Sequence, residues 1–127
     1  MKKIIISSLN APKPIGPYNQ AVMVNDTLYI SGQIPLNAGN NELIIGDIKK
    51  ETKQVMKNLG YLLKAADMKF ENVVKSSIFL SEMDNFNEVN EVYGSYFENE
   101  SAPARETVAV KTLPKNVRVE ISMIAVK

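Results

Sequence analysis

Residues 117–126 read VRVEISMIAV, a strict alternation that predicts a β-strand with two different faces. One face is apolar and suited to packing under helices; its members are Val117, Val119, Ile121, Met123 and Ala125. The other face mixes polar and apolar groups; its members are Arg118, Glu120, Ser122, Ile124 and Val126. A mixed face of this kind is too apolar for free solvent and too polar for a core. We therefore expect it to lie at an interface with other copies of the chain.

Two helices are predicted upstream of this strand, and they would cover its apolar face. Asp47 is the expected N-cap of the first helix, in which apolar residues recur at helical spacing from Ile48 to Ala66. Lysines and Glu51 fall on the opposite side of that helix. The second helix is predicted over residues 83–97. Its inward face is marked by Phe86, Val89, Tyr93 and Tyr96.

The other apolar runs predict five more strands, at residues 3–7, 21–24, 27–31, 73–81 and 107–110. Asn25-Asp26 is typical of the tight turn of a hairpin, whereas residues 11–20 and 32–46 are expected to be loops. The order β-β-β-α-β-α-β-β predicts an α+β sandwich in which both helices cover one face of a single sheet. We expect residues 1–127 to form one domain.

The composition excludes several kinds of chemistry. The sequence contains no His and no Cys, which rules out disulfides, thiolate nucleophiles, Ser-His-Asp triads and nearly all zinc sites. It has neither a clustered acidic loop nor a glycine-rich phosphate loop, so we expect no metal and no cofactor. A net charge of +1 argues against a nucleic-acid surface. No apolar run is long enough for an export signal or a membrane span, so we expect a cytoplasmic protein that does not contact membranes.

Several motifs follow one another over nearly the whole chain: residues 16–22 (GPYNQAV), 31–35 (SGQIP), 86–93 (FNEVNEVY), 103–105 (PAR), 113–115 (LPK) and 119–121 (VEI). In this order they resemble the Rid family, also called the YjgF family. The resemblance implies a chorismate-mutase-like fold with a mixed sheet and a homotrimer with ligand sites at the subunit interfaces. It also implies cofactor-free hydrolysis of enamines and imines such as 2-aminoacrylate, 2-iminobutanoate and 2-iminopropanoate, which escape from pyridoxal-phosphate enzymes. The products are 2-keto acids and ammonia.

Arg105 is the expected substrate anchor, because each of these substrates carries a carboxylate that a guanidinium can bind through two hydrogen bonds. In a strand, Arg105 and Thr107 point to one side and Glu106 to the other, so Glu106 need not neutralise Arg105. Glu120 is the expected proton shuttle, since a partly buried carboxylate has a raised pKa and can orient or deprotonate water. The structural alternative for Glu120 is an interfacial ion pair with Arg118 or with a lysine of another subunit.

The resemblance adds further substrate-binding candidates: Tyr18, Gly32, Gln33, Ile34, Asn90 and Thr107. Tyr18 would wall the site, although it could equally pack the proline-rich loop onto the sheet. Gly32 would let backbone amides approach a ligand, although a glycine after a strand is often only a turn. Asn90 matches a family asparagine near the site, and an exposed helical amide is its alternative. Thr107 stands where the archetypal branch of the family often has cysteine. We expect this change to be tolerated, because the ligand contact that the resemblance implies at this position uses the backbone amide.

Three further residues depart from the family pattern, namely Asn19, Glu106 and Ser122. Ser122 stands where many members carry a second acid. If that acid assists proton transfer in the archetypal branch, we expect a slower enzyme or a different substrate preference. Two other function classes stay open on sequence grounds. One is a non-catalytic trimer that senses keto acids through the same arginine. The other is an RNA-directed role, against which the near-neutral charge and the missing histidine speak.

Overall fold

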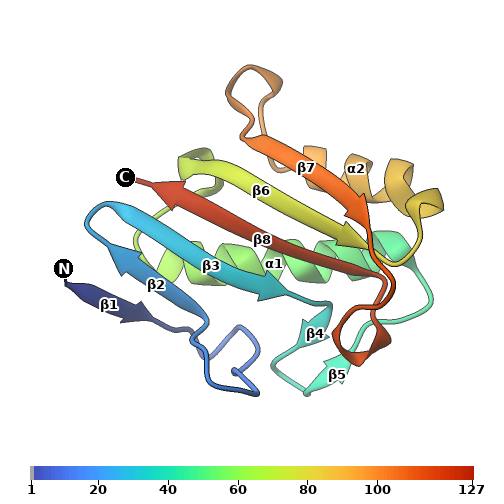
Figure 1. The fold of residues 1–127 in the computed structure, drawn as a ribbon, viewed down its shortest axis with the longest axis horizontal. Coiled ribbons are helices and arrows are strands. Elements are labelled where there is room, and N and C mark those ends of the chain that lie inside the picture. Colours follow the sequence, from blue (N-terminus) through green and yellow to red (C-terminus); the bar gives the residue numbers. More distant parts are fainter. Residues whose placement is uncertain (1) are drawn as a thin grey trace.

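The computed structural model describes residues 2–127, which form a six-stranded mixed sheet with two α-helices on one face (Figure 1). The strand order is β1-β2-β3-β8-β6-β7, and all neighbours are antiparallel except the parallel pair β6 and β7. The bounds are β1 (Lys3–Ile6), β2 (Ala21–Val24), β3 (Thr27–Gln33), β6 (Val73–Leu80), β7 (Ala104–Ala109), β8 (Val119–Val126), α1 (Ile48–Ala65) and α2 (Phe86–Gly94). This arrangement confirms the expected α+β sandwich.

Strand β8 lies in the middle of the sheet, between β3 and β6, and its alternation matches the prediction. The apolar set from Val117 to Ala125 is buried beneath the helices, and Val119, Ile121 and Ala125 have no exposed surface. The residues between them are only partly covered, because no helix or strand of residues 2–127 covers the other face of the sheet. We call this uncovered side the open face.

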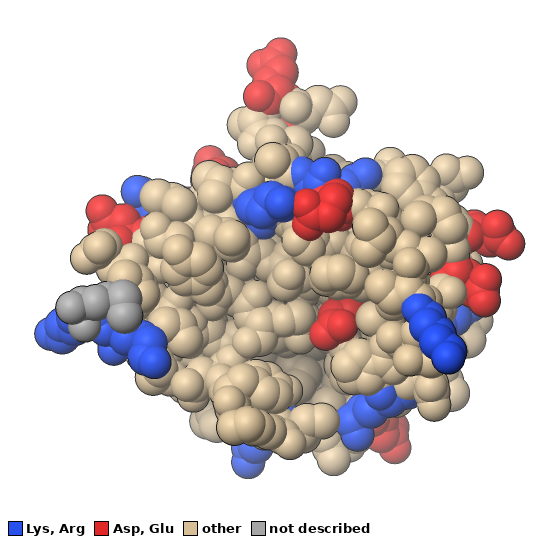
Figure 2. Space-filling model, in the orientation of Figure 1, with Lys and Arg blue, Asp and Glu red and all other residues tan. Residues whose placement is uncertain are grey.

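The open face carries exposed apolar side chains on several strands. Ile5, Tyr29, Val108 and Val126 are between 37% and 49% exposed. Figure 2 looks onto this face and shows charged side chains mainly around its rim, with few near its centre. Of the helices in the described residues, none is long and apolar enough to cross a bilayer.

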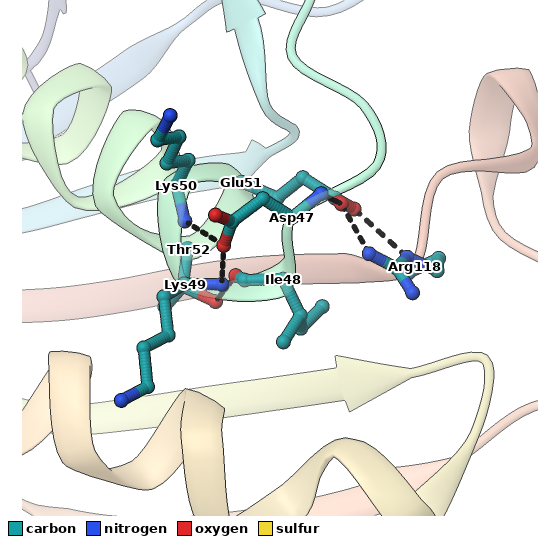
Figure 3. Close-up of polar contacts among 7 residues, drawn as sticks. All are labelled: Asp47, Ile48, Lys49, Lys50, Glu51, Thr52 and Arg118. Atoms are coloured by element: carbon teal, nitrogen blue, oxygen red, sulfur yellow. Dashed lines mark hydrogen bonds and ion pairs between the residues drawn. The ribbon is translucent and has the colours of Figure 1, made fainter.

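Helix α1 begins as expected, since the Asp47 side chain accepts hydrogen bonds from the backbone amides of Lys49 and Lys50 (3.0 and 3.2 Å; Figure 3). The placement of Glu51 on the solvent side was wrong. Glu51 is 2% exposed, and its carboxylate pairs with the guanidinium of Arg118 just before β8 (Figure 3). It also accepts the Asp47 backbone amide at 3.1 Å. The pair ties the start of α1 to the start of β8.

The remaining differences concern segment lengths. The second helix is shorter than predicted: residues 83–85 form a separate 3₁₀ turn, and α2 ends at Gly94, where the Ser95 hydroxyl caps the Val92 carbonyl (2.6 Å). The predicted loop at residues 32–46 contains the short hairpin β4 (Leu36–Asn37) and β5 (Glu42–Leu43). Glycine and asparagine dominate the turn of this hairpin, so the segment resembles a loop in sequence. Its two-residue strands are too short to show a hydrophobic alternation.

Candidate active site

Five of the candidate residues line one cavity of about 70 Å³ at the edge of the open face, next to β3 and β8. They are Tyr18, Gly32, Gln33, Ile34 and Glu120. Apolar side chains from the proline-rich loop, the β4 segment and Pro114 also line the cavity, together with Gln20 and two lysines, Lys13 and Lys115. We call this the Glu120 cavity. Neither lysine was predicted as a site residue: Lys13 gives no sequence signal, and Lys115 belongs to the LPK motif, to which no role was assigned.

The buried side-chain amide of Gln20 holds the proline-rich loop, residues 11–20, in place. The Gln20 side chain donates to the carbonyls of Ala11 (3.1 Å) and Pro12 (2.8 Å) and accepts from the Ser8 amide (2.9 Å). These bonds hold the loop against the sheet edge. They thereby place Tyr18, which is 49% exposed, on the cavity wall.

Glu120 is half-buried, and that burial raises the pKa of its carboxyl group. The expected alternative, an ion pair with Arg118, does not form within the chain because Arg118 is paired with Glu51. The carboxyl group lies directly against Gly32: a Cβ atom on residue 32 would be 2.9 Å from Cδ of Glu120. Gly32 therefore has a steric role, since a side chain at this position would displace the carboxylate.

Gln33 carries an unused hydrogen-bond acceptor. The residue is 5% exposed, and its Nε2 donates to the Ser31 carbonyl at 3.1 Å, which fixes the orientation of the amide. Its Oε1 is buried without a partner, one of two such side-chain atoms among residues 2–127. Buried acceptors are nearly always satisfied, so an oxygen of this kind is a place for an ordered water molecule or another polar partner.

Arg105 lies elsewhere, on the edge strand β7 and against α2. Its Nη1 donates to Oδ1 of Asn90 at 2.7 Å, which brings these two candidate residues together. As predicted, Glu106 points away and pairs with Lys75 (2.6 Å) and with the Ser77 hydroxyl, contacts that lower the pKa of Glu106. Thr107 follows on the Arg105 side, and its hydroxyl oxygen is the second unpartnered buried atom of the described residues. We call Arg105, Asn90 and Thr107 the Arg105 cluster.

Arg105 and Glu120 thus lie on opposite faces of the sheet. The Arg105 cluster faces α2, whereas Glu120 alternates with the helix-facing residues of β8 and belongs to the open face. Strand β6 separates β7 from β8, as Figure 1 shows. The Glu120 cavity contains no residue of the Arg105 cluster. Among residues 2–127 there is also no group of three or more acidic side chains placed to hold a metal ion.

Comparison with known proteins identifies the family. Residues 8–127 match the family model described as Endoribonuclease L-PSP. The mouse protein named 2-iminobutanoate/2-iminopropanoate deaminase is 49% identical, over 97% of this chain and 90% of its own length. The structure of a Rid-family protein of unknown function from Yersinia pestis superposes with a TM-score of 0.96 at 44% identity, covering 99% of this chain and 100% of that one. Escherichia coli TdcF with bound serine gives 0.91 at 33% identity, covering 98% of each chain. The chain belongs to the YjgF/RidA family, as its separated motifs had indicated.

Proposed function

We propose that this protein hydrolyses small 2-imino acids and their enamine tautomers to 2-keto acids and ammonia, in sites formed between the subunits of a homotrimer. The observation that carries the proposal is the division of the candidate residues. Arg105, which would bind the substrate carboxylate, and Glu120, which would transfer protons, lie on opposite faces of the sheet. One chain alone therefore cannot use both groups on a small substrate. The name of the mouse relative supports the reaction class.

In a trimer, Arg105 of one subunit and Glu120 of its neighbour can contribute to the same site. The exposed apolar residues of the open face need cover, and neighbouring copies provide it. A neighbour packed on this face brings its own β7 edge, with Arg105, to the mouth of the Glu120 cavity.

The chemistry follows from the two groups. Arg105 binds the substrate carboxylate with the N–H groups that Asn90 leaves free. Glu120, kept protonated more easily by its raised pKa, protonates the enamine carbon to give the iminium ion. The resulting carboxylate takes a proton from the water that attacks C2, which forms the carbinolamine. Glu120 then protonates the nitrogen, ammonia leaves, and the hydroxyl proton returns to Glu120 as the keto group forms.

The test is enamine hydrolysis, with the enamine generated in place by a serine or threonine dehydratase and ammonia release measured over the uncatalysed rate. Charge-assisted hydrogen bonds contribute about 1.5–3 kcal/mol each. Loss of two of them in Arg105→Ala should lower kcat/KM by about 10²–10⁴-fold. Wild-type turnover in an Arg105→Ala trimer would refute the assignment.

One observation favours a second function. Escherichia coli TdcF was crystallised with bound serine, an amino acid whose carboxylate an arginine could hold. A non-catalytic sensor of keto or amino acids would bind such ligands but release no ammonia in the same assay.

A further inference from the structure

The guanidinium of Arg105 lies along one face of helix α2. Three residues make this face, Phe86, Asn90 and Tyr93, which are spaced four and three positions apart and therefore project to the same side. The Cζ atom of Arg105 is 5.8 Å from the ring centre of Phe86 and 5.1 Å from that of Tyr93. Both distances lie within the range of cation–π attraction.

Tyr93 is itself fixed in position. It is 5% exposed, and its hydroxyl donates to the Ser76 hydroxyl oxygen at 2.9 Å. Ser76 is fully buried on β6 and lies directly opposite Arg105 in the β6–β7 register. The Phe97 ring packs 4.9 Å from the Tyr93 ring. The ring thus bridges from α2 to the neighbouring strand and forms a rigid surface beneath the arginine side chain.

From this geometry we infer that Tyr93 is a positioning residue that acts through Arg105, with Phe86 as its auxiliary. A free arginine side chain samples many rotamers, and a ligand that fixes one of them loses affinity. Tyr93, Phe86 and Asn90 together hold the guanidinium in place before the ligand arrives. The N–H groups not bonded to Asn90 then remain available for a carboxylate. The inference extends the proposed function, but the arrangement of the arginine can be measured without it.

The chain offers a matched control for Tyr93. Tyr96 is three positions further along, partly buried, and packs on Phe70 at 5.0 Å between ring centres. Burial raises the pKa of both tyrosines. The Arg105 guanidinium lies over the Tyr93 ring, whereas Tyr96 packs on an aromatic cluster. Tyr93→Leu and Tyr96→Leu remove the same group from the same segment, and only the first removes the ring beneath the arginine.

The direct measurement is the nitrogen-15 spectrum of the arginine Nε–H groups. The sequence contains two arginines, Arg105 and Arg118, so the spectrum has two resonances, and Arg118 serves as an internal reference. Aromatic ring currents should shift the Arg105 proton away from its position in a free arginine. We expect Tyr93→Leu to move this resonance towards the free position. Tyr93→Phe should keep most of the shift, and Tyr96→Leu should leave it unchanged.

The second measurement is a titration with pyruvate and, as an uncharged control, with pyruvamide. Tyr93→Leu should weaken pyruvate binding by about 2- to 30-fold, the span of measured cation–π contributions. Pyruvamide binding should not change, whereas a general folding defect would weaken both. Tyr93→Phe should recover most of the loss. If Tyr93→Leu does not fold, Phe86→Leu, at a partly exposed position, should give a smaller shift of the same kind.

Two results would overturn the inference. One is an Arg105 resonance and a pyruvate affinity that stay as in wild type when Tyr93 is replaced by Leu. The other is an equal effect of Tyr96→Leu. If wild-type protein releases no ammonia and binds no pyruvate, the proposed function fails. The Arg105 resonance then still decides whether Tyr93 holds the arginine.

Discussion

The carboxyl group of Glu120 lies against the α-carbon of Gly32, with no room for a side chain between them. Gly32 has an ordinary backbone conformation, so the constraint is steric rather than conformational. Two adjacent strands, β3 and β8, create this contact at the β-bulge that shifts their register between Ile30 and Gln33. The position of the proposed proton shuttle therefore depends on a residue that carries no chemistry of its own.

Gly32→Ala should lower kcat by at least about tenfold, because displacing a proton-transfer group removes part of the 10²–10⁴-fold that such catalysis contributes. Pyruvate binding through Arg105 should change less. Gly94→Ala is the control, since a Cβ at the end of α2 meets no atom within 4 Å. It should keep full activity. Equal kinetics for the two variants would show that the Glu120 carboxylate is not held by Gly32.

The raised pKa of Glu120 makes a prediction about stability. Its ordinary value is 4.5, and burial raises it in the folded protein. The stability contributed by the protonated carboxyl is therefore complete below pH 4.5 and is lost as the pH rises through the folded pKa. Glu120→Gln copies the neutral form, so it should be more stable than wild type at pH 7 and equally stable near pH 4. Urea unfolding at equal protein concentrations measures this. A difference that stays constant with pH would contradict it.

The Glu51–Arg118 pair should respond unequally to loss of either partner. Arg118→Ala leaves a carboxylate that is 3% exposed without its cation, and should cost about 3 kcal/mol, the low end for a broken buried pair because Arg118 is 39% exposed. The double variant Glu51→Gln/Arg118→Ala should be more stable than Arg118→Ala alone. Urea unfolding gives both free energies. If the second substitution further destabilises the protein, the buried charge is not the cause.

Local patterns predicted most of the fold. The period-two alternation of residues 117–126 located both faces of β8, and Asp47 located the start of α1, because each signal depends on neighbouring residues. Glu51 was misplaced because the partner that allows its burial, Arg118, lies 67 residues away. No helical periodicity can reveal such a pair.

The sequence predicted only part of the candidate site. The motifs supplied the candidate residues. Strand alternation correctly predicted that Arg105 and Glu106 point to opposite sides of β7. The division between two faces depends on the strand order, in which β6 separates β7 from β8, and the sequence does not reveal that order. The contacts of Phe86 and Tyr93 with Arg105 could have been predicted, because helical spacing puts both residues on the same helix face as Asn90. That face was instead assigned to the hydrophobic core.

The oligomeric state is the simplest check of the interface. Sedimentation equilibrium at micromolar concentration should give three times the chain mass of 14.1 kDa. Charged substitutions at Tyr29 or Val126, exposed apolar residues of the open face, should dissociate the assembly and abolish turnover together. An active monomer would remove the reason for sites between subunits.

Mixing two inactive variants tests the shared site most directly. Arg105→Ala and Glu120→Gln are each expected to be nearly inactive, and subunit exchange between their trimers is verified by mass spectrometry. If each site takes Arg105 from one subunit and Glu120 from its neighbour, random mixing at equal amounts creates intact sites at about a quarter of the interfaces. Ammonia release should then return to about a quarter of the wild-type rate. Hybrid trimers that stay as inactive as the two parents would contradict the account.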